Sequence, residues 1–161
     1  MPKKENNEIE SKSQIVNNYT TEVQGYYNQY INKMIRYEKD LLNISKAMGS
    51  MVDTIGFANL IEDKEAIGAL QEANDIFLEI TTTLSTVETT EQLRDYHNSM
   101  SITALSFSKF TSDIIESTEN GSLDTFRDGV QSYRDAKSNL EVAISLRQES
   151  TKGMFFLKIE E

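Results

Sequence analysis

The feature that most constrains this chain is a stripe of large apolar side chains in its first third. The stripe recurs every three or four residues from position 19 to position 55, a mean step of 3.6 residues, which is the period of a straight α-helix. A helix predicted from about Ser13 to about Asp53 cannot cover such a face alone, so other helices must pack against it. The stripe consists of Tyr19, Val23, Tyr26, Tyr30, Met34, Tyr37, Leu41, Ile44, Met48, Met51 and Ile55.

Three shorter amphipathic helices are predicted beyond Gly56, the first plausible break. The first begins near Asn59 or Ile61, and Asn59 has the spacing of an N-cap with Glu62 as its capping-box partner. It ends within residues 81–90, where hydroxyl and β-branched side chains favour helix ends. The next helix is predicted to begin at a second capping box, Thr89 with Gln92.

The last two predicted helices are separated by Asn120 and Gly121, which both tolerate the left-handed conformation of a helix C-terminus. Ser122 is the expected cap of the final helix, which ends near Ser150. The predicted core stripe of this helix is Phe126, Val130, Tyr133, Lys137, Leu140 and Ile144.

Four helices joined by short turns favour antiparallel neighbours. The predicted fold is therefore all-α, an up-down-up-down antiparallel four-helix bundle with an overlong first helix, over residues 14–152. Residues 1–13 are charged and polar and are predicted to form a flexible tail. Residues 153–161 are predicted to form an apolar C-terminal extension.

Charge and composition exclude several classes of function. The formal net charge of -10 repels nucleic-acid phosphates and anionic lipid headgroups, so we expect no nucleic-acid partner. The chain has no cysteine, which excludes disulfides and thiolate zinc sites. No apolar stretch approaches the length of a membrane span, so direct membrane insertion is not expected.

Catalytic and metal motifs are also missing from the sequence. The single histidine, His97, has Arg94 three residues before it, whereas a di-iron carboxylate bundle needs glutamate there. No phosphate-binding glycine loop and no His-Glu-x-x-His motif occurs. We therefore expect a protein that is not an enzyme and has no cofactor and no metal site.

Two clusters are candidates for a protein interface. Tyr26, Tyr27 and Tyr30 cannot all point into one core, because Tyr26 and Tyr27 are about 100° apart on a helix. Tyrosine is enriched at interfaces, so these three could form a protein-binding or self-association face, or a wide seam of the bundle. The second cluster is an acidic stripe that could dock a basic partner or form a solvated helix face; it comprises Glu65, Glu72, Asp75 and Glu79.

Polar residues on the predicted core stripes define an alternative class of function. Asn74, His97, Thr111 and Lys137 could orient a small ligand between the helices of a sensor-type bundle. A third class is an acidic inhibitor or decoy that sequesters a basic nucleic-acid-binding protein. The main hypothesis is a non-enzymatic interaction module that recognises a protein partner, or a second copy of itself, through a helix face.

The segment from Val87 to Ile144 has a sequence pattern that is similar to that of a known group of proteins. It contains the approach VETTEQLRDYH, which ends at His97, the turn ENGSLD at residues 119–124, and a closing helix with Ala136, Leu140 and Ala143. This pattern resembles the C-terminal half of small helical surface lipoproteins of Gram-positive bacteria, over about a third of the chain. The sequence departs from that pattern by lacking a proline before the helix of His97 and the cysteine that carries the lipid.

The resemblance implies an extracytoplasmic helical domain on a tether, with any lipid anchor outside this sequence. It implies no activity and no functional residue. Composition alone is equally compatible with a cytoplasmic protein.

Overall fold

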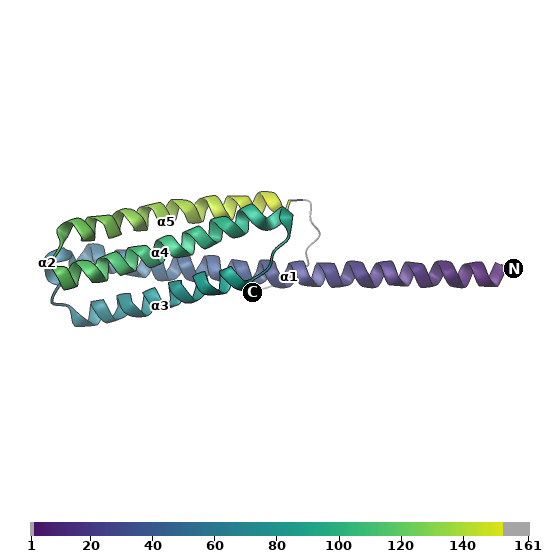
Figure 1. The fold of residues 1–161 in the computed structure, drawn as a ribbon, viewed down its shortest axis with the longest axis horizontal. Coiled ribbons are helices and arrows are strands. Elements are labelled where there is room, and N and C mark those ends of the chain that lie inside the picture. The colour runs from purple at the N-terminus through teal and green to yellow at the C-terminus, as the bar shows by residue number, and fades with distance from the viewer. Residues whose placement is uncertain (1, 153–161) are drawn as a thin grey trace. The chain divides into compact units, whose positions relative to one another are not determined.

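The computed structural model describes the backbone of residues 2–152, together with the side chains of residue 22 and residues 24–152. This part of the chain contains only helices and connecting turns, so the all-α prediction is confirmed. The C-terminal extension predicted at residues 153–161 lies outside the described residues. The elements are α1 (Pro2–Ile55), α2 (Phe57–Leu60), α3 (Lys64–Thr86), the 3-10 helix η1 (Glu91–Leu93), α4 (Arg94–Asn120) and α5 (Leu123–Ser150) (Figure 1).

The start of α1 differs from the prediction. Helical backbone begins at Pro2, whereas the sequence predicts a helix from about Ser13 and a flexible tail before it. Proline suits the first position of a helix, because its φ is already helical and its missing N–H would have no acceptor there. The lysine and glutamate residues that follow it have a high intrinsic helix propensity, which does not depend on packing. The helix can therefore begin well before the first residue of the apolar stripe, on which the predicted start was based.

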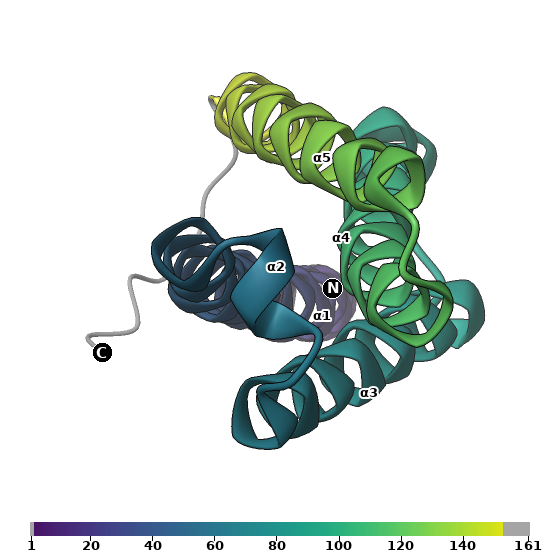
Figure 2. The same cartoon turned by 90° about the vertical axis from the view of Figure 1, so that its left-hand side faces the viewer.

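The chain divides into two compact units, and the boundary between them lies inside α1. One unit comprises Met1–Ile35 with Gly153–Glu161, and the other is Arg36–Lys152. The second unit holds the last part of α1 together with α2, α3, α4 and α5. In the end-on view α4 lies between α3 and α5 (Figure 2).

The second unit has a contiguous apolar core. Val52 of α1 packs in one cluster with Leu60, Ala66, Leu70, Phe110 and Ile114. Further along the bundle, the rings of Phe77 and Phe107 stack with their centroids 5.5 Å apart. Both side chains are fully buried, and each buried side chain of this size stabilises the fold by roughly 1.5–3 kcal/mol.

Two of the predicted turns are confirmed, and one cap is corrected. Gly56 interrupts the helix with φ of 75°, and Gly121 ends α4 with φ of 64°, both in the region that favours glycine. Ser122 caps α5 as predicted, because its Oγ accepts a hydrogen bond from the backbone N–H of Thr125. The cap of α3 is Asp63, which accepts from the N–H of Ala66, so the prediction of Asn59 as this cap is wrong.

The approach to α4 also differs from the prediction. A capping box was expected at Thr89 and Gln92, yet the chain there forms the 3-10 turn η1 before α4 begins at Arg94. The side chain of Thr90, the residue before η1, makes no capping bond. Gln92 instead donates its side-chain N–H to the backbone carbonyl of Ser150, the last residue of α5. The side chain expected to cap one helix therefore bonds the end of another.

The most buried face of α5 shares only Leu140 with the predicted stripe of large residues. Its buried members are mostly small, and at Gly129 an added Cβ would lie 2.8 Å from the Cδ1 of Ile114. Small side chains allow α5 to approach α4 closely, whereas Phe126, Val130 and Tyr133 are only half-buried. The buried residues of α5 are Gly129, Ser132, Ala136, Leu140 and Ala143.

Candidate functional site

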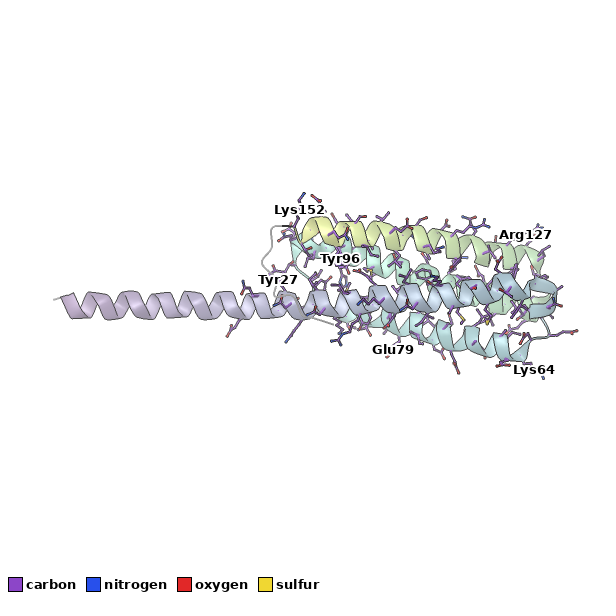
Figure 3. The ribbon with its side chains drawn as sticks, turned by 180° about the vertical axis from the view of Figure 1, so that it is seen from behind. Tyr27, Lys64, Glu79, Tyr96, Arg127 and Lys152 are labelled. Carbon is purple, nitrogen blue, oxygen red and sulfur yellow. The ribbon has the colours of Figure 1, made fainter. Side chains whose placement is uncertain are left out.

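The acidic cluster lies on the outer face of α3. The residue seven positions after Glu65 is Glu72, and the next is Glu79, so the three carboxylates follow one side of the helix. All three residues and Asp75 are exposed, opposite the buried side that carries Leu70 and Phe77. Figure 3 marks α3 with Lys64 at its start and Glu79 near its end.

The carboxylates of this face are unpaired. None of the four forms a hydrogen bond or an ion pair with any described residue. Ile76 lies four residues after Glu72 and three before Glu79, and its side chain is 38% exposed. We call Glu65, Glu72, Asp75, Ile76 and Glu79 the α3 face. It combines unscreened negative charge with one apolar side chain in contact with solvent.

The three candidate tyrosines of α1 are not equivalent. Tyr26 is 45% exposed, Tyr27 is half-buried, and Tyr30 is only 5% exposed. The rings of Tyr26 and Tyr27 meet edge to face, with centroids 5.9 Å apart and planes at 70°. Tyr30 is therefore nearly fully buried, whereas Tyr26 keeps an exposed side, so the three residues do not contribute equally to one accessible surface.

Asn74 and Thr111 come together as a closed hydrogen-bonded group. The Oδ1 atom of Asn74 accepts from Thr111 Oγ1 at 2.8 Å and from Ser108 Oγ at 3.1 Å. Thr111 is fully buried and Ser108 is nearly so. These bonds join α3 to α4 and use the carbonyl oxygen of Asn74 within the protein.

His97 is also bonded within the chain. It is 7% exposed, and its Nε2 lies 2.8 Å from the backbone carbonyl oxygen of Leu84. A carbonyl can only accept, so Nε2 carries the proton and donates it. Leu84 is in the last turn of α3, where carbonyls lack helical partners. His97 therefore satisfies a helix end, and the structure does not bring it together with Asn74 and Thr111.

Lys137 lies apart from the other three predicted polar residues. It is exposed, and its Nζ is 5.3 Å from the centroid of the Tyr133 ring, a cation–π geometry. It lines a half-open cavity of about 580 Å³ between α1 and α5. The four residues predicted as one ligand site are thus distributed over three places.

A buried polar network that sequence reasoning missed joins α1, α4 and α5. The Tyr96 hydroxyl donates to Glu38 Oε2 at 2.5 Å. Arg147 donates from Nε to the same oxygen at 2.7 Å and from Nη2 to Glu38 Oε1 at 2.9 Å. Tyr96 is fully buried and is labelled in Figure 3. Both carboxylate oxygens of Glu38 are satisfied, so this network holds helices in register and leaves no group poised for chemistry.

The electrostatics of Arg147 follow from this pairing. Burial of the guanidinium acts to lower the pKa of Arg147, but the hydrogen bond and the charge of Glu38 act to raise it and prevail. Its pKa is therefore raised above its ordinary value. The sequence does contain a signal for the network: Glu38 is four residues after Met34 and three before Leu41, both fully buried. The sequence pattern places the adjacent and more apolar Tyr37, not Glu38, in the apolar stripe.

Within the described residues no cluster of histidine and carboxylate side chains has the geometry to hold a metal ion. In the same part of the chain, no helix combines the length and the apolar character needed to cross a bilayer. The fold and these contacts define a class, an all-α helical protein in which Asn74, His97 and Glu38 are paired internally, while the buried hydroxyl oxygens of Thr89 and Thr90 have no hydrogen-bond partner among the described residues. No protein-family model, curated protein or solved structure matches this chain.

Proposed function

We propose that this chain is a non-enzymatic helical interaction module that binds a basic, partly apolar protein segment on the α3 face. The main observation in support of the proposal is that the carboxylates of the α3 face are not paired with cations. Its four carboxylates have no cationic partner among the described residues, whereas the buried carboxylate of Glu38 is fully paired. Charge on this surface is thus available to an external partner.

The α3 face also offers an apolar anchor. Ile76 is 38% exposed among carboxylates that are three or four positions away on the same helix. In protein interfaces, long-range charge raises the association rate and fixes orientation, while a desolvated apolar contact supplies much of the affinity. A partner with lysine or arginine around one apolar side chain would match both features.

A rigid scaffold behind α3 suits this role, and we propose the up-down-up-down topology for it. Support comes first from α3 and α4. Asn74 bonds Thr111 near the middle of both helices, whereas Leu84 at the end of α3 bonds His97 at the start of α4. Residue numbers that rise along one helix and fall along the other are typical of antiparallel packing.

Contacts between α1 and α5 support the same topology. Gly49 lies against Tyr133, and Glu38, earlier in α1, bonds Arg147, later in α5. The numbers again run in opposite senses along the two helices. The Gram-positive lipoprotein resemblance would place this module on a tether outside the cell, and that location stays a prediction.

The proposal is tested with a lysine-rich amphipathic helical peptide as the probe. Replacing Glu65, Glu72 and Glu79 with lysine should weaken peptide binding by at least about tenfold, because each exposed ion pair is worth about 0.2–1 kcal/mol and reversal also adds repulsion. Fluorescence anisotropy of the labelled peptide at low ionic strength measures the affinity. Light scattering of the protein alone detects self-association through the same face.

The matched control reverses three exposed acids elsewhere, Glu116 of α4 with Glu141 and Glu149 of α5. The net charge changes equally, so a nonspecific attraction would weaken by the same factor in both triple variants. Equal weakening, or no saturable binding by the unmodified protein, would contradict the proposal. A smaller separate loss on Ile76→Ser, with helicity unchanged, is the expected sign of the apolar anchor.

A further inference from the structure

The cavity between α1 and α5 has an unusual pair of walls. On the α5 side it is formed by Phe126, Val130 and Tyr133, three large side chains that are only half-buried. On the α1 side it is lined by Gly49, which has no side chain, and by the short polar side chains of Ser50 and Asp53. These three α5 side chains pack against the apolar core on one side and border the groove on the other.

The floor of the groove is aromatic and firmly held. Phe110 is 1% exposed, and its ring lies 4.9 Å from the ring of Tyr133, centroid to centroid. Tyr133 in turn fits against α1 only because position 49 is glycine, since an added Cβ there would overlap the Tyr133 ring. A binding surface with this much internal support needs little reorganisation when a ligand enters.

The rim of the groove carries the opposite charge to the protein as a whole. Lys46, Arg134 and Lys137 all line it, against the single carboxylate of Asp53, in a chain of net charge -10. None of the three cations forms an ion pair with a described residue. Three unpaired cations around an apolar wall are complementary to an anion that also has an apolar body.

We infer that the α1–α5 groove binds an amphipathic carboxylate, with its hydrocarbon body against Phe126, Val130 and Tyr133 and its carboxylate among Lys46, Arg134 and Lys137. The volume of about 580 Å³ falls within the range of small-molecule sites, roughly 300–1,000 Å³. The groove is separate from the α3 face, so this inference does not depend on the proposed protein partner.

The test uses dodecanoate as the probe, below its micellar concentration, with dodecanol and dodecyltrimethylammonium as probes with the same tail. Isothermal titration calorimetry should show saturable binding of one dodecanoate per chain. Dodecanol should bind at least about tenfold more weakly, and the cationic probe more weakly still, because each favourable or unfavourable charge contact at this rim is worth a few tenths to 1 kcal/mol.

Two variants locate the site. The triple change Lys46→Glu, Arg134→Glu and Lys137→Glu should weaken dodecanoate binding by at least about tenfold, whereas Lys64→Glu, at an exposed position of α3, should leave it unchanged. Val130→Trp should abolish binding by filling the groove. Because the triple change affects exposed side chains only, it tests the site even if Val130→Trp does not fold.

Three outcomes would overturn the inference. The first is equal affinity for dodecanoate and dodecanol, which would mean that the cations do not recognise the carboxylate. The second is unchanged dodecanoate binding in the triple variant. The third is binding to anionic vesicles without binding to monomeric dodecanoate, which would make this rim a membrane contact and not a ligand site.

Discussion

The two sides of the second unit, Arg36–Lys152, differ both in surface charge and in what joins their helices. On the α3–α4 side, neutral hydrogen bonds from Ser108 and Thr111 to Asn74 connect the helices, and the outer surface is acidic. On the α1–α5 side, the ion pair of Glu38 and Arg147 connects the helices, and the groove beside it has a basic rim. One helical scaffold thus presents surfaces of opposite charge.

This difference shows how charge is used in an acidic protein. Where a carboxylate is buried, as at Glu38, the structure pairs it completely. The exposed carboxylates of the α3 face and the exposed cations of the groove rim form no ion pair with any residue that the structure describes. The paired groups should therefore govern stability, and the unpaired groups should govern binding.

The largest effect on stability is expected on the α1–α5 side. Glu38→Ala removes the acceptor of both Arg147 and Tyr96 and leaves a largely buried guanidinium without a counter-ion. We expect the free energy of unfolding to fall by about 3 kcal/mol, near the lower end for broken buried pairs because the Arg147 side chain keeps 18% exposure. Urea denaturation followed by circular dichroism measures the change. Tyr96→Phe, which leaves the ion pair intact, should cost about 1.5 kcal/mol.

A smaller effect is expected for the neutral bonds of the α3–α4 side. Asn74→Ala removes the acceptor of Ser108 Oγ and Thr111 Oγ1, and we expect a loss of about 1–2 kcal/mol in the same denaturation experiment. The carbonyl oxygens of Ser108 and Phe107 lie 3.0 and 3.3 Å from Thr111 Oγ1 and are alternative acceptors for its single proton, which limits the loss. If Asn74→Ala lowered the unfolding free energy as much as Glu38→Ala does, the two sides would not differ in how strongly their polar contacts stabilise the fold.

Helix caps should contribute about equally on both sides. Asp63→Ala at the start of α3 and Ser122→Ala at the start of α5 each remove one side-chain bond to a backbone N–H. We expect each change to lower the unfolding free energy by about 1 kcal/mol. Ser122 Oγ also accepts from the Thr125 hydroxyl at 3.0 Å, so a slightly larger loss at Ser122→Ala is expected. A clearly larger loss at Asp63→Ala would show that the local packing of α3 matters more than the caps.

The smallest effect is expected at the surface pair of Lys109 and Asp113. The Lys109 side chain is 61% exposed, so Lys109→Ala should lower the unfolding free energy by less than about 0.5 kcal/mol. The hydrogen bond to Asp113 raises the pKa of Lys109 above its ordinary value of 10.5. The contribution of the pair is therefore complete below that ordinary pKa and is lost as the pH rises through the raised one. Stability measured at pH 7 and at strongly alkaline pH, in the unmodified protein and in Lys109→Ala, tests this sign.

Sequence periodicity predicts the helices well but assigns their faces less reliably. The breaks at Gly56 and Gly121 and the cap at Ser122 were predictable, because each depends on local backbone chemistry. The buried face of α5 was not, because its close approach to α4 depends on small residues such as Gly129 and Ala136 that carry little hydrophobic signal. The larger residues Phe126, Val130 and Tyr133 are only partly buried: they pack at the edge of the core and also line the groove.

The candidate sites show the same limit. The exposure of Glu65, Glu72 and Glu79 follows from their seven-residue spacing opposite the apolar stripe. The position of Glu38 between Met34 and Leu41 indicates that it is buried, but its partners Tyr96 and Arg147 could not be predicted, since they are 58 and 109 positions away along the chain. Helical periodicity can place a polar residue on a buried face, but one sequence alone does not show which residue of a distant helix it pairs with.

The most direct test of the proposed function is to map amide chemical shifts by NMR while the lysine-rich amphipathic peptide is added to the isotope-labelled protein. The account predicts that the largest shift changes cluster between Glu65 and Glu79 and disappear in the triple lysine variant, while amides around Val130 and Lys137 stay unchanged. Changes centred on any other helix face, or spread evenly over all acidic residues, would contradict it.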